Sequence, residues 1–592
     1  MSQFNTFHRT HHCAALSIAD VNTEVRLAGW VSSVRKMGKF TFLVLRDHYG
    51  ITQLIVDSDA QPETFETASR LKSESVVFAK GKVRARSPKD INKSLPTGEI
   101  EVECTEIIID SLVENLPFPL NDDNVNEELR LKYRFIDLRR NKLHQNIILR
   151  TKVIFEIRKF MIQEGFLELQ TPILTVSSPE GARDYVVPSR VHPGKFYALP
   201  QAPQQYKQLL MCSGFDRYFQ IAPCFRDEDA RADRSPGEFY QLDMEMAFID
   251  KEDLFTILER MFEHLTKTVS SKRVLQVPFP RMTYDYAMNT YGNDKPDIRY
   301  DVKISDITEQ AAALESDFFK NALTGDNRLR VIKAPGSAGE TRKFYDRLND
   351  VAKKHHPRGI VYVYKDAEGF KSNWQKQISQ EDMQKLQQIT DLAPEDCLFI
   401  CIGEKKLASK TLGVLRPEIA AHKNLIEKDL LAFCWIVDFP MYEFNEEDNK
   451  IDFSHNPFSM PQGGMNALQN QDPLSILADQ YDIVCNGYEL SSGAIRNHRP
   501  DIMYKAFDIA GYSKEQVDEK FGHMISAFSY GAPPHGGIAP GVDRIVMIYA
   551  DEPNIREVIT FPMNQRAQEL MMGSPAEITQ KQLKELNIKI AE

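Results

Sequence analysis

The chain has 592 residues, of which 42% are hydrophobic and 27% charged, with a formal net charge of −11. This length exceeds what one hydrophobic core supports, so we expect several domains of ordinary globular composition. No apolar stretch is long enough to span a membrane, and residues 1–12 resemble neither a signal peptide nor a complete transit peptide. The sequence therefore predicts a cytoplasmic protein with no membrane partner.

The acidic total does not exclude a nucleic-acid partner, because binding depends on where the charges lie. Residues 26–46 contain five basic and no acidic residues, and residues 80–93 contain six basic residues and one acidic residue. The eight cysteines show no paired CxxC spacing, so we expect neither a zinc site nor a disulfide framework. These patterns favour RNA binding by the first hundred residues.

Apolar and polar positions alternate in five short runs, at 25–28, 40–45, 51–56, 75–79 and 100–104. Five such strands predict a small barrel of the OB-fold type, with a hairpin turn at residues 47–50. In such barrels bases stack on aromatic rings while basic side chains follow the phosphates, which makes Arg35, Phe42 and Gln53 candidates. An aromatic residue on a strand is more often part of the core, so the pattern leaves both placements of Phe42 open.

Beyond a polar, acidic linker, apolar residues recur at helical spacing from His144 to Gly165. A strand pattern then runs from Phe166 to Pro172. Residues 296–425 contain a helix pattern and strand patterns of their own, which predict an inserted α/β domain. A further strand pattern, at 433–440, resumes the main sheet after this insertion.

Two arginines stand in motifs that suit nucleotide phosphates. Arg226 follows Phe225 and opens an acidic run, and Arg544 follows the glycine-punctuated run 536–542. A planar guanidinium can bind phosphate oxygens through two parallel hydrogen bonds. We expect Gly537 and Gly541 to let the backbone approach a ligand closely, and a buried helix to follow them.

These two runs resemble the second and third signature motifs of class II aminoacyl-tRNA synthetases. The helix and strand that end at Pro172 resemble the first motif, which forms the dimer interface in that family. The resemblance implies a multidomain α+β protein with an N-terminal OB-fold barrel, an antiparallel-sheet catalytic domain and an inserted α/β domain. The expected boundaries are 1–112 for the barrel, 113–140 for the linker, 141–295 and 426–592 for the two parts of the catalytic domain, the second with a C-terminal extension, and 296–425 for the insertion.

Two pairs of charged residues indicate what the catalytic domain binds. Asp482 and Glu489 are seven residues apart in an apolar strand pattern, and carboxylate oxygens are suitable ligands for Mg²⁺, although isolated acids are more often surface charges. Lys207 and Arg496 are two cations that would suit a side-chain carboxylate. With these included, the chain resembles the bacterial type of aspartyl-tRNA synthetases over nearly its full length, and the insertion is typical of that type.

This resemblance implies an aminoacyl-tRNA ligase that activates L-aspartate with ATP and transfers it to the terminal adenosine of tRNA-Asp, with tRNA-Asn left open. For aspartate it implies binding by Lys207, Arg496 and Arg226, with Asp243 shaping the network, Gln204 and Glu180 near the amino group, and His455 closing the pocket. For ATP it implies Arg226, Glu228, Phe239, Glu489 and Arg544, with Arg226 and Arg544 catalytic and Asp482 and Glu489 as Mg²⁺ ligands. It further implies anticodon contacts from Arg35, Phe42, Gln53 and Glu101, and a homodimer interface at Pro172.

Three departures from the family pattern affect this transfer. Ala202 replaces a serine that often contacts the substrate amine, Asn456 replaces a second histidine, and Pro236-Gly237 lengthens the second motif. Asparaginyl- and lysyl-tRNA synthetases remain alternatives, although paired cations would leave a charge unpaired against an amide and would repel an ammonium group. A non-catalytic tRNA-binding paralogue is a third alternative, but Arg226, Arg544 and Glu489 are all present.

Overall fold

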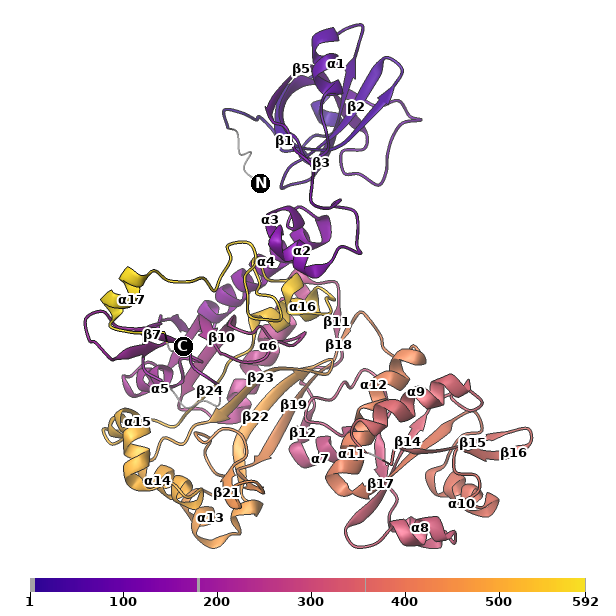
Figure 1. Ribbon diagram of the computed structural model, residues 1–592, viewed down its shortest axis with the longest axis vertical. Helices are drawn as coiled ribbons and strands as arrows, with labels where there is room; N and C mark the ends of the chain where they lie inside the picture. The colour runs from indigo at the N-terminus through magenta and orange to yellow at the C-terminus, as the bar shows by residue number, and fades with distance from the viewer. Residues whose placement is uncertain (1–5, 178–181, 357, 591–592) are drawn as a thin grey trace. The chain divides into compact units, whose positions relative to one another are not determined.

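The computed structural model describes residues 6–177, 182–356 and 358–590, and the chain divides into two compact units at Val125 (Figure 1). Among these described residues, no helix combines the length and the apolar character needed to cross a membrane. Each unit has its own hydrophobic core.

The first unit confirms the predicted OB-fold barrel. Its strands close in the order β1 (Glu24–Met37), β2 (Phe40–Arg46), β3 (Ile51–Asp57), β5 (Ile100–Ser111) and β4 (Val76–Ala85). β1 continues well beyond the predicted run, through Gly29, where a Cβ atom would lie 2.3 Å from the carbonyl oxygen of Arg46. This glycine therefore marks a close approach of two strands, not the end of one. A helix that the sequence analysis missed, α1 (Pro62–Ser69), joins β3 to β4.

The second unit is built on an eight-stranded sheet that is antiparallel except at its two edges. The strand order is β12 (Arg281–Thr283), β19 (Phe433–Pro440), β22 (Leu477–Cys485), β23 (Tyr488–Ile495), β24 (His535–Ile538), β10 (Glu238–Ala247), β9 (Arg217–Phe225) and β6 (Leu167–Glu168). Three helices, α4 (Asn141–Gln163), α6 (Lys251–Val269) and α16 (Val542–Tyr549), pack on it in one continuous core. The predicted antiparallel catalytic domain is thus confirmed.

Strand alternation places the polar side chains of this sheet on the face opposite the helices. On β10, Leu242, Met244 and Met246 belong to the helix-covered core. The alternating positions Phe239, Gln241, Asp243 and Glu245 therefore point to the other face. The same parity holds on β22, where Tyr481 and Ile483 are core residues and Asp482 lies between them. The chemistry of the chain is thus concentrated on one face of the sheet.

The insertion forms a separate five-stranded sheet with helices around it. Its strand order is β13 (Ile304–Asp306), β14 (Asn327–Ala334), β17 (Cys397–Glu404), β15 (Val361–Asp366) and β16 (Gly369–Ser372). Its helices are α8 (Asp317–Ala322), α9 (Arg342–Lys353), α10 (Gln380–Thr390), α11 (Lys405–Gly413) and α12 (Leu415–His422). Alternate residues of β14 and β17 enter two different cores, which confirms the predicted mixed α/β character.

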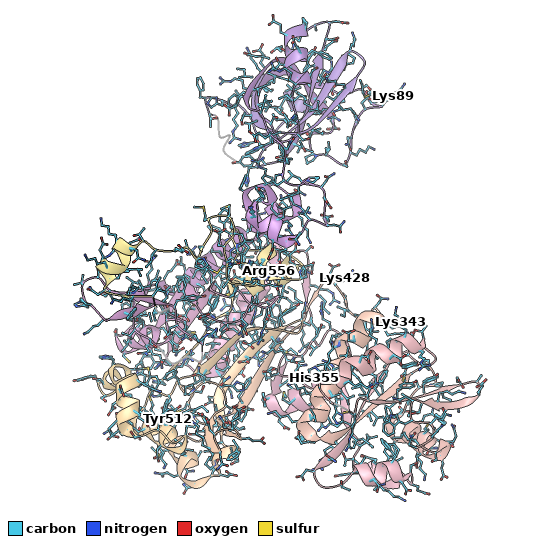
Figure 2. All side chains as sticks on the ribbon, viewed as in Figure 1. Lys89, Lys343, His355, Lys428, Tyr512 and Arg556 are labelled. Carbon is cyan, nitrogen blue, oxygen red and sulfur yellow. The ribbon has the colours of Figure 1, made fainter. Side chains whose placement is uncertain are left out.

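Part of the expected linker is helical and belongs to the second unit. Its helices are α2 (Glu127–Lys132) and α3 (Arg134–Asp137). Arg134 is only 2% exposed and donates to the carbonyl oxygens of Arg556 and Ile559, both at 2.7 Å. Arg556, labelled in Figure 2, in turn donates from Nε to Glu127. These charge-assisted contacts hold α2 and α3 against the C-terminal part of the chain.

The remaining α-helices and strands include three two-stranded pairs. They are β7 (Val186–Pro188) with β8 (Phe196–Ala198), β11 (Arg273–Val274) with β18 (Leu430–Leu431), β20 (Tyr442–Asn445) with β21 (Lys450–Phe453), α5 (Gln204–Cys212), α7 (Tyr284–Tyr291), α13 (Gly464–Asn470), α14 (Pro500–Ile509), α15 (Lys514–Phe528) and α17 (Gln580–Leu586).

Candidate active site

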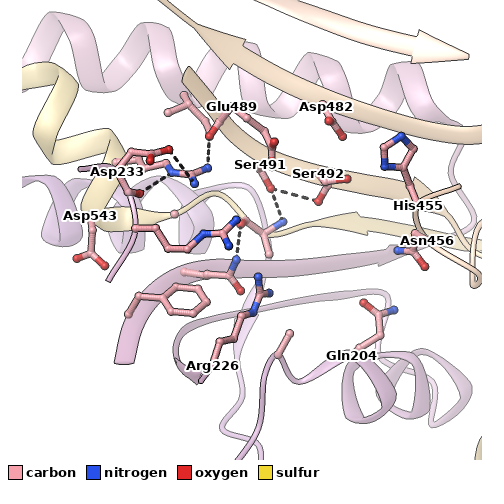
Figure 3. Close-up of a pocket in the computed structure, with 18 of the residues that line it drawn as sticks. Gln204, Arg226, Asp233, His455, Asn456, Asp482, Glu489, Ser491, Ser492 and Asp543 are labelled. Carbon is pink, nitrogen blue, oxygen red and sulfur yellow. Dashed lines mark hydrogen bonds and ion pairs between the residues drawn. The ribbon is translucent and has the colours of Figure 1, made fainter. Parts of the chain in front are cut away.

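A cavity of about 550 Å³ opens on the polar face of the eight-stranded sheet (Figure 3). The sequence-predicted residues that line it are Gln204, Lys207, Arg226, Glu228, Phe239, His455, Asp482, Glu489, Arg496 and Arg544. Segments far apart in the chain thus meet in one cavity, whose size is ordinary for a small-molecule site. Asp243 lies directly behind Lys207, Glu180 falls outside the described residues, and Pro172 is exposed outside the cavity.

Two cations and two carboxylates form a buried network at one end of the cavity. Lys207 Nζ lies 2.6 Å from Asp243 and 3.6 Å from Glu245. Arg496 donates from Nε and Nη2 to the two oxygens of Glu245, at 2.9 and 3.2 Å. All four side chains are at most 2% exposed, and Glu245 bridges the two cations. We call this group the Lys207–Arg496 network.

The electrostatics of this network differ from the sequence-based expectation, which counted two cations and one acid. Glu245 was missed, although its place two residues after Asp243 on a strand puts it on the same face. The network has two positive and two negative side chains and is formally balanced. Burial alone opposes ionisation of Glu245, but Arg496 and then Lys207 overcome it and lower the pKa of this carboxyl. Lys207 and Arg496 nevertheless line the cavity. A lysine ammonium has three N–H donors and a guanidinium has five, so both side chains have donors beyond those used within the network.

Gly537 has a different role from the one expected. A Cβ atom there would lie 1.9 Å from Glu245 Oε2 and 2.2 Å from the carbonyl oxygen of Met244. The glycine therefore makes room for a buried carboxylate of the neighbouring strand, and the expectation that it admits a ligand is wrong. At Gly541, which lines the cavity, the nearest atom to such a Cβ is the carbonyl oxygen of Leu490, at 3.8 Å. Only Gly541 is placed for the expected role.

Arg226 and Arg544 line the same cavity as this network. Arg226 sits with its guanidinium carbon 5.0 Å from the ring centre of Phe239 and donates from Nε to the carbonyl oxygen of Gln201. Arg544 pairs with Asp233 at 3.1 Å and donates to the carbonyl oxygens of Asp233 and Glu489. Figure 3 shows Asp233 on one side of the close-up and Gln204 on the other. The two arginines can thus bind anionic groups between an aromatic ring and the sheet.

Asp482 and Glu489 lie on the hairpin of β22 and β23. The hairpin turns through Asn486 and Gly487, whose φ angles of 53° and 86° are those of an Asn-Gly turn with two left-handed residues. Lys295, which the sequence analysis did not single out, also lines the cavity and lies 2.7 Å from Glu489. The hairpin and Lys295 together place two carboxylates and one ammonium group in the cavity.

This pair of carboxylates fits a divalent metal ion. Asp482 Oδ1 is buried and has no hydrogen-bond partner among the described residues. Burial raises the pKa of Asp482 well above its usual value, and Glu489 adds to this effect. Burial acts in the same direction on Glu489, but Lys295, together with Arg544 and Arg234, overcomes it and lowers the pKa of that carboxyl. A hard cation such as Mg²⁺ would be bound by oxygens of both carboxylates, Asp482 and Glu489. Nucleotide phosphates and water would complete its coordination.

The two departures at the cavity differ in what they provide. Ala202 lines the cavity with a methyl group only. Asn456 also lines it, but its Oδ1 accepts from the backbone N–H of Phe458 at 2.9 Å and so stabilises its own loop. Burial lowers the pKa of the adjacent His455, so this imidazole is neutral at pH 7. At that pH His455 therefore adds no charge to the cavity.

In the barrel unit, the four candidate residues share one surface. Phe42 is half-buried, whereas Thr41 and Leu43 on either side are fully buried, so the core placement left open by the pattern is wrong. Arg35 lies with its guanidinium carbon 5.4 Å from the centre of the Phe42 ring. Gln53 donates to Glu101 at 2.8 Å. The four residues belong to β1, β2, β3 and β5, neighbours in the barrel.

Comparison with known proteins agrees with both units. Residues 126–565 match the family model described as tRNA synthetases class II (D, K and N), and residues 25–110 match an OB-fold nucleic acid binding domain. The chain is 57% identical to an aspartate–tRNA(Asp/Asn) ligase of Pelodictyon phaeoclathratiforme, covering 98% of this chain and 97% of that protein. It is 56% identical to the protein of the same name from Chlorobium chlorochromatii, covering 98% and 96%.

A solved structure gives the same fold at low sequence identity. The asparaginyl-tRNA synthetase of Pyrococcus horikoshii, complexed with asparaginyl-adenylate, is similar with a TM-score of 0.59 and 19% identity, covering 94% of this chain and 98% of that one. This likeness supports the fold alone, whereas the family model covers most of the chain. The chain therefore belongs to the class II tRNA synthetases.

Proposed function

We propose that this protein activates L-aspartate with ATP and transfers the aspartyl group to tRNA. The observation that carries this proposal is one cavity lined both by Lys207 and Arg496 of the network and by Arg226 and Arg544. The network offers cationic donors to a substrate carboxylate, and the two arginines offer donors to a triphosphate. The names of the relatives that are more than half identical support aspartate as the amino acid.

The side chains position the two substrates and stabilise charge. In the first step, an oxygen of the aspartate α-carboxylate attacks the α-phosphorus, the bond to the leaving oxygen breaks, and pyrophosphate departs. Arg226 neutralises charge around the attacked phosphorus, Arg544 binds the terminal phosphate, and Phe239 stacks on the adenine. Mg²⁺ held by Asp482 and Glu489 would supply further positive charge to the phosphates. In the second step, a ribose hydroxyl of the tRNA attacks the acyl carbon and AMP leaves.

The remaining roles follow from position. For the described residues, Gln204 faces the amino group, Glu228 contacts the adenine edge, and His455 closes the pocket, as the family resemblance implies. Glu180 lies outside the described residues, and its role near the amino group stays a prediction. Glu228 pairs with Arg234 in this structure, so contact with adenine requires that ion pair to rearrange. The cytoplasmic location expected from the sequence stays a prediction.

Amino-acid specificity tests the proposal directly. Aspartate-dependent exchange of pyrophosphate into ATP is expected, with a rate at least about a hundredfold above that with asparagine, because an amide cannot replace the charge that Lys207 and Arg496 receive from a carboxylate. Both amino acids are compared at the same concentration without tRNA. Equal exchange with asparagine would refute the aspartyl assignment.

Charging of tRNA-Asn as well as tRNA-Asp is the second question. The relatives named above are called ligases for both tRNAs, which favours dual specificity here. Charging purified tRNA-Asp and tRNA-Asn side by side distinguishes the two possibilities.

Removing the ring of Phe42 should weaken tRNA binding without affecting activation. For Phe42→Ala we expect a loss of about 1–3 kcal/mol, the usual value for one base stacked on an aromatic ring. The control is Phe7→Ala, which removes a ring that is 82% exposed elsewhere in the barrel unit, beside Phe78. Filter binding measures tRNA affinity and pyrophosphate exchange measures activation. If exchange falls as much as binding, Phe42 supports the structure of the protein and not the anticodon.

We also infer a homodimer formed through the first motif. Exposed apolar side chains follow one another along α4, β6 and the segment around Pro172, namely Phe155, Ile162, Leu167, Ile173, Leu174 and Val176, each 47–67% exposed. Phe155 and Ile162 are seven residues apart and share a helix face. An apolar surface of this kind is typical of a subunit interface. On the same helix, Arg150 pairs with Asp543, the neighbour of Arg544, which links this surface to the cavity.

Charge placed on this surface should produce monomers. The double variant Phe155→Glu/Ile162→Glu is expected to sediment as a monomer at micromolar concentration, where the wild-type chain sediments as a dimer, because two buried carboxylates oppose association. Tyr530→Glu is the control, since Tyr530 is 89% exposed and lies outside this surface. A wild-type monomer with full activity would show that the interface is not needed.

A further inference from the structure

We propose that Lys295 is a positioning residue that occupies the place of the metal ion's charge beside Glu489 until metal and nucleotide bind. The proposal rests on the function proposed above and assigns a role to the segment that leads into the inserted domain. Lys295 Nζ lies 2.7 Å from Glu489 Oε2, inside the cavity. Glu489 also lies near Arg544 and Arg234, but Lys295 is the cation that forms an ion pair with its carboxylate, which acts electrostatically on the buried Asp482.

The backbone around Lys295 is held against the metal-binding hairpin. A Cβ atom at Gly487, in the turn of the hairpin, would lie 3.4 Å from Asp297 Cβ and 3.9 Å from the carbonyl oxygen of Lys295. The 295–297 segment thus packs within van der Waals distance of the turn, where the φ of 86° at Gly487 is the feature that requires glycine. The position of Lys295 relative to Glu489 is therefore fixed by packing as well as by charge.

The inserted domain supplies the anchor for this segment. Arg416, on α12, is 1% exposed and donates to the carbonyl oxygens of Asp297 at 2.9 Å and Val302 at 2.6 Å. The rings of Tyr291 and Tyr300 lie 4.7 and 5.0 Å from its guanidinium carbon. A buried guanidinium that donates two hydrogen bonds and packs between two rings is a rigid support. The insertion thus holds the base of the segment from which Lys295 reaches the cavity.

The side chain of Lys295 is free to change partner while its base stays fixed. Its side chain is 44% exposed, and a lysine ammonium sits on a flexible four-carbon stem. When phosphate oxygens and a metal ion are present, Glu489 is needed as a ligand, and Lys295 can turn to a phosphate oxygen as its new anionic partner. Lys295 would then prevent the two carboxylates from binding a metal ion in the absence of nucleotide, and would contact the nucleotide once it is bound.

Metal binding without nucleotide separates this role from catalysis. Mn²⁺, which accepts the same oxygen ligands as Mg²⁺, is titrated into the full chain without ATP, and free Mn²⁺ is measured by electron paramagnetic resonance. Lys295→Met keeps much of the stem and removes the charge, and we expect it to bind Mn²⁺ about tenfold more tightly than wild type. Lys295→Arg keeps the charge and should resemble wild type.

The matched control is Lys303→Met. Lys303 lies in the same segment, is 49% exposed and pairs with Asp301 at 2.8 Å, but it does not line the cavity. It should leave Mn²⁺ affinity unchanged. In a Glu489→Gln background, Lys295→Met should give no gain, because the carboxylate that it releases is gone.

Unchanged or weaker Mn²⁺ binding by Lys295→Met, or an equal gain in Lys303→Met, would overturn the proposal. So would a full gain in the Glu489→Gln background. These results are independent of the wild-type exchange assay with aspartate, whose failure would refute the proposed function instead. As a second measurement, Lys295→Met should raise the KM for ATP in exchange, with Lys295→Arg restoring it in part.

Discussion

Replacing Arg496 with leucine is expected to lower aspartate-dependent pyrophosphate exchange about a thousandfold, which corresponds to ~4 kcal/mol of lost stabilisation for a buried charge partner. Arg496 is 2% exposed and lines the cavity, so leucine there would remove a buried cationic donor from the proposed carboxylate site. ATP affinity, measured by calorimetry, should change little, because we propose that the triphosphate binds at Arg226 and Arg544.

A double variant that also changes Glu245 separates loss of substrate binding from loss of stability. Arg496→Leu alone leaves Glu245 buried without its two hydrogen bonds from Arg496 and with only Lys207, at 3.6 Å, as a charged partner, which would destabilise the fold. Arg496→Leu/Glu245→Gln removes the extra charge. If this double variant regains thermal stability but stays inactive, Arg496 binds the substrate.

Arg499→Leu is the matched control for Arg496. Arg499 stands three residues further on, is 56% exposed, and pairs with Asp501 at 2.7 Å. Its replacement should leave exchange within about twofold of wild type, since exposed ion pairs contribute little. A loss of less than tenfold in Arg496→Leu, with the fold intact, would place the carboxylate of aspartate elsewhere.

Replacing Arg226 with alanine is the second large effect that we expect. Exchange should fall about a thousandfold, because removing one donor that stabilises transition-state charge typically costs ~3–4 kcal/mol. Arg226 is held beside Phe239 and by the carbonyl oxygen of Gln201, so its position is set before substrates arrive. This preorganisation is why the loss should appear mainly in kcat.

Arg231→Ala provides the control for Arg226→Ala. Arg231 belongs to the same motif but is exposed and does not line the cavity. Exchange, which requires no tRNA, should be unaffected by this change. If both variants lose activity equally, the effect comes from the charge of the whole motif loop and not from contact between Arg226 and the phosphate.

Much of the fold and of the cavity could be predicted from the sequence. Alternating and helical patterns depend on which face of an element is buried, so they identified the barrel and the helix α4. The arginine motifs likewise pointed to residues that now line one cavity, since the motif residues themselves contact the ligand in that family. Local pattern and family motif were sufficient for these features.

Only the tertiary structure decided how the charges pair. Glu245 and Arg496 are 251 residues apart, and nothing in either segment indicates that the two strands place them within 2.9 Å. Lys295 meets Glu489 because the segment before the insertion packs on a hairpin turn. Gly537 was misread for the same reason, since its neighbour is a carboxylate of another strand. Sequence pattern depends on local periodicity, whereas ion pairing and close packing depend on the register between distant segments.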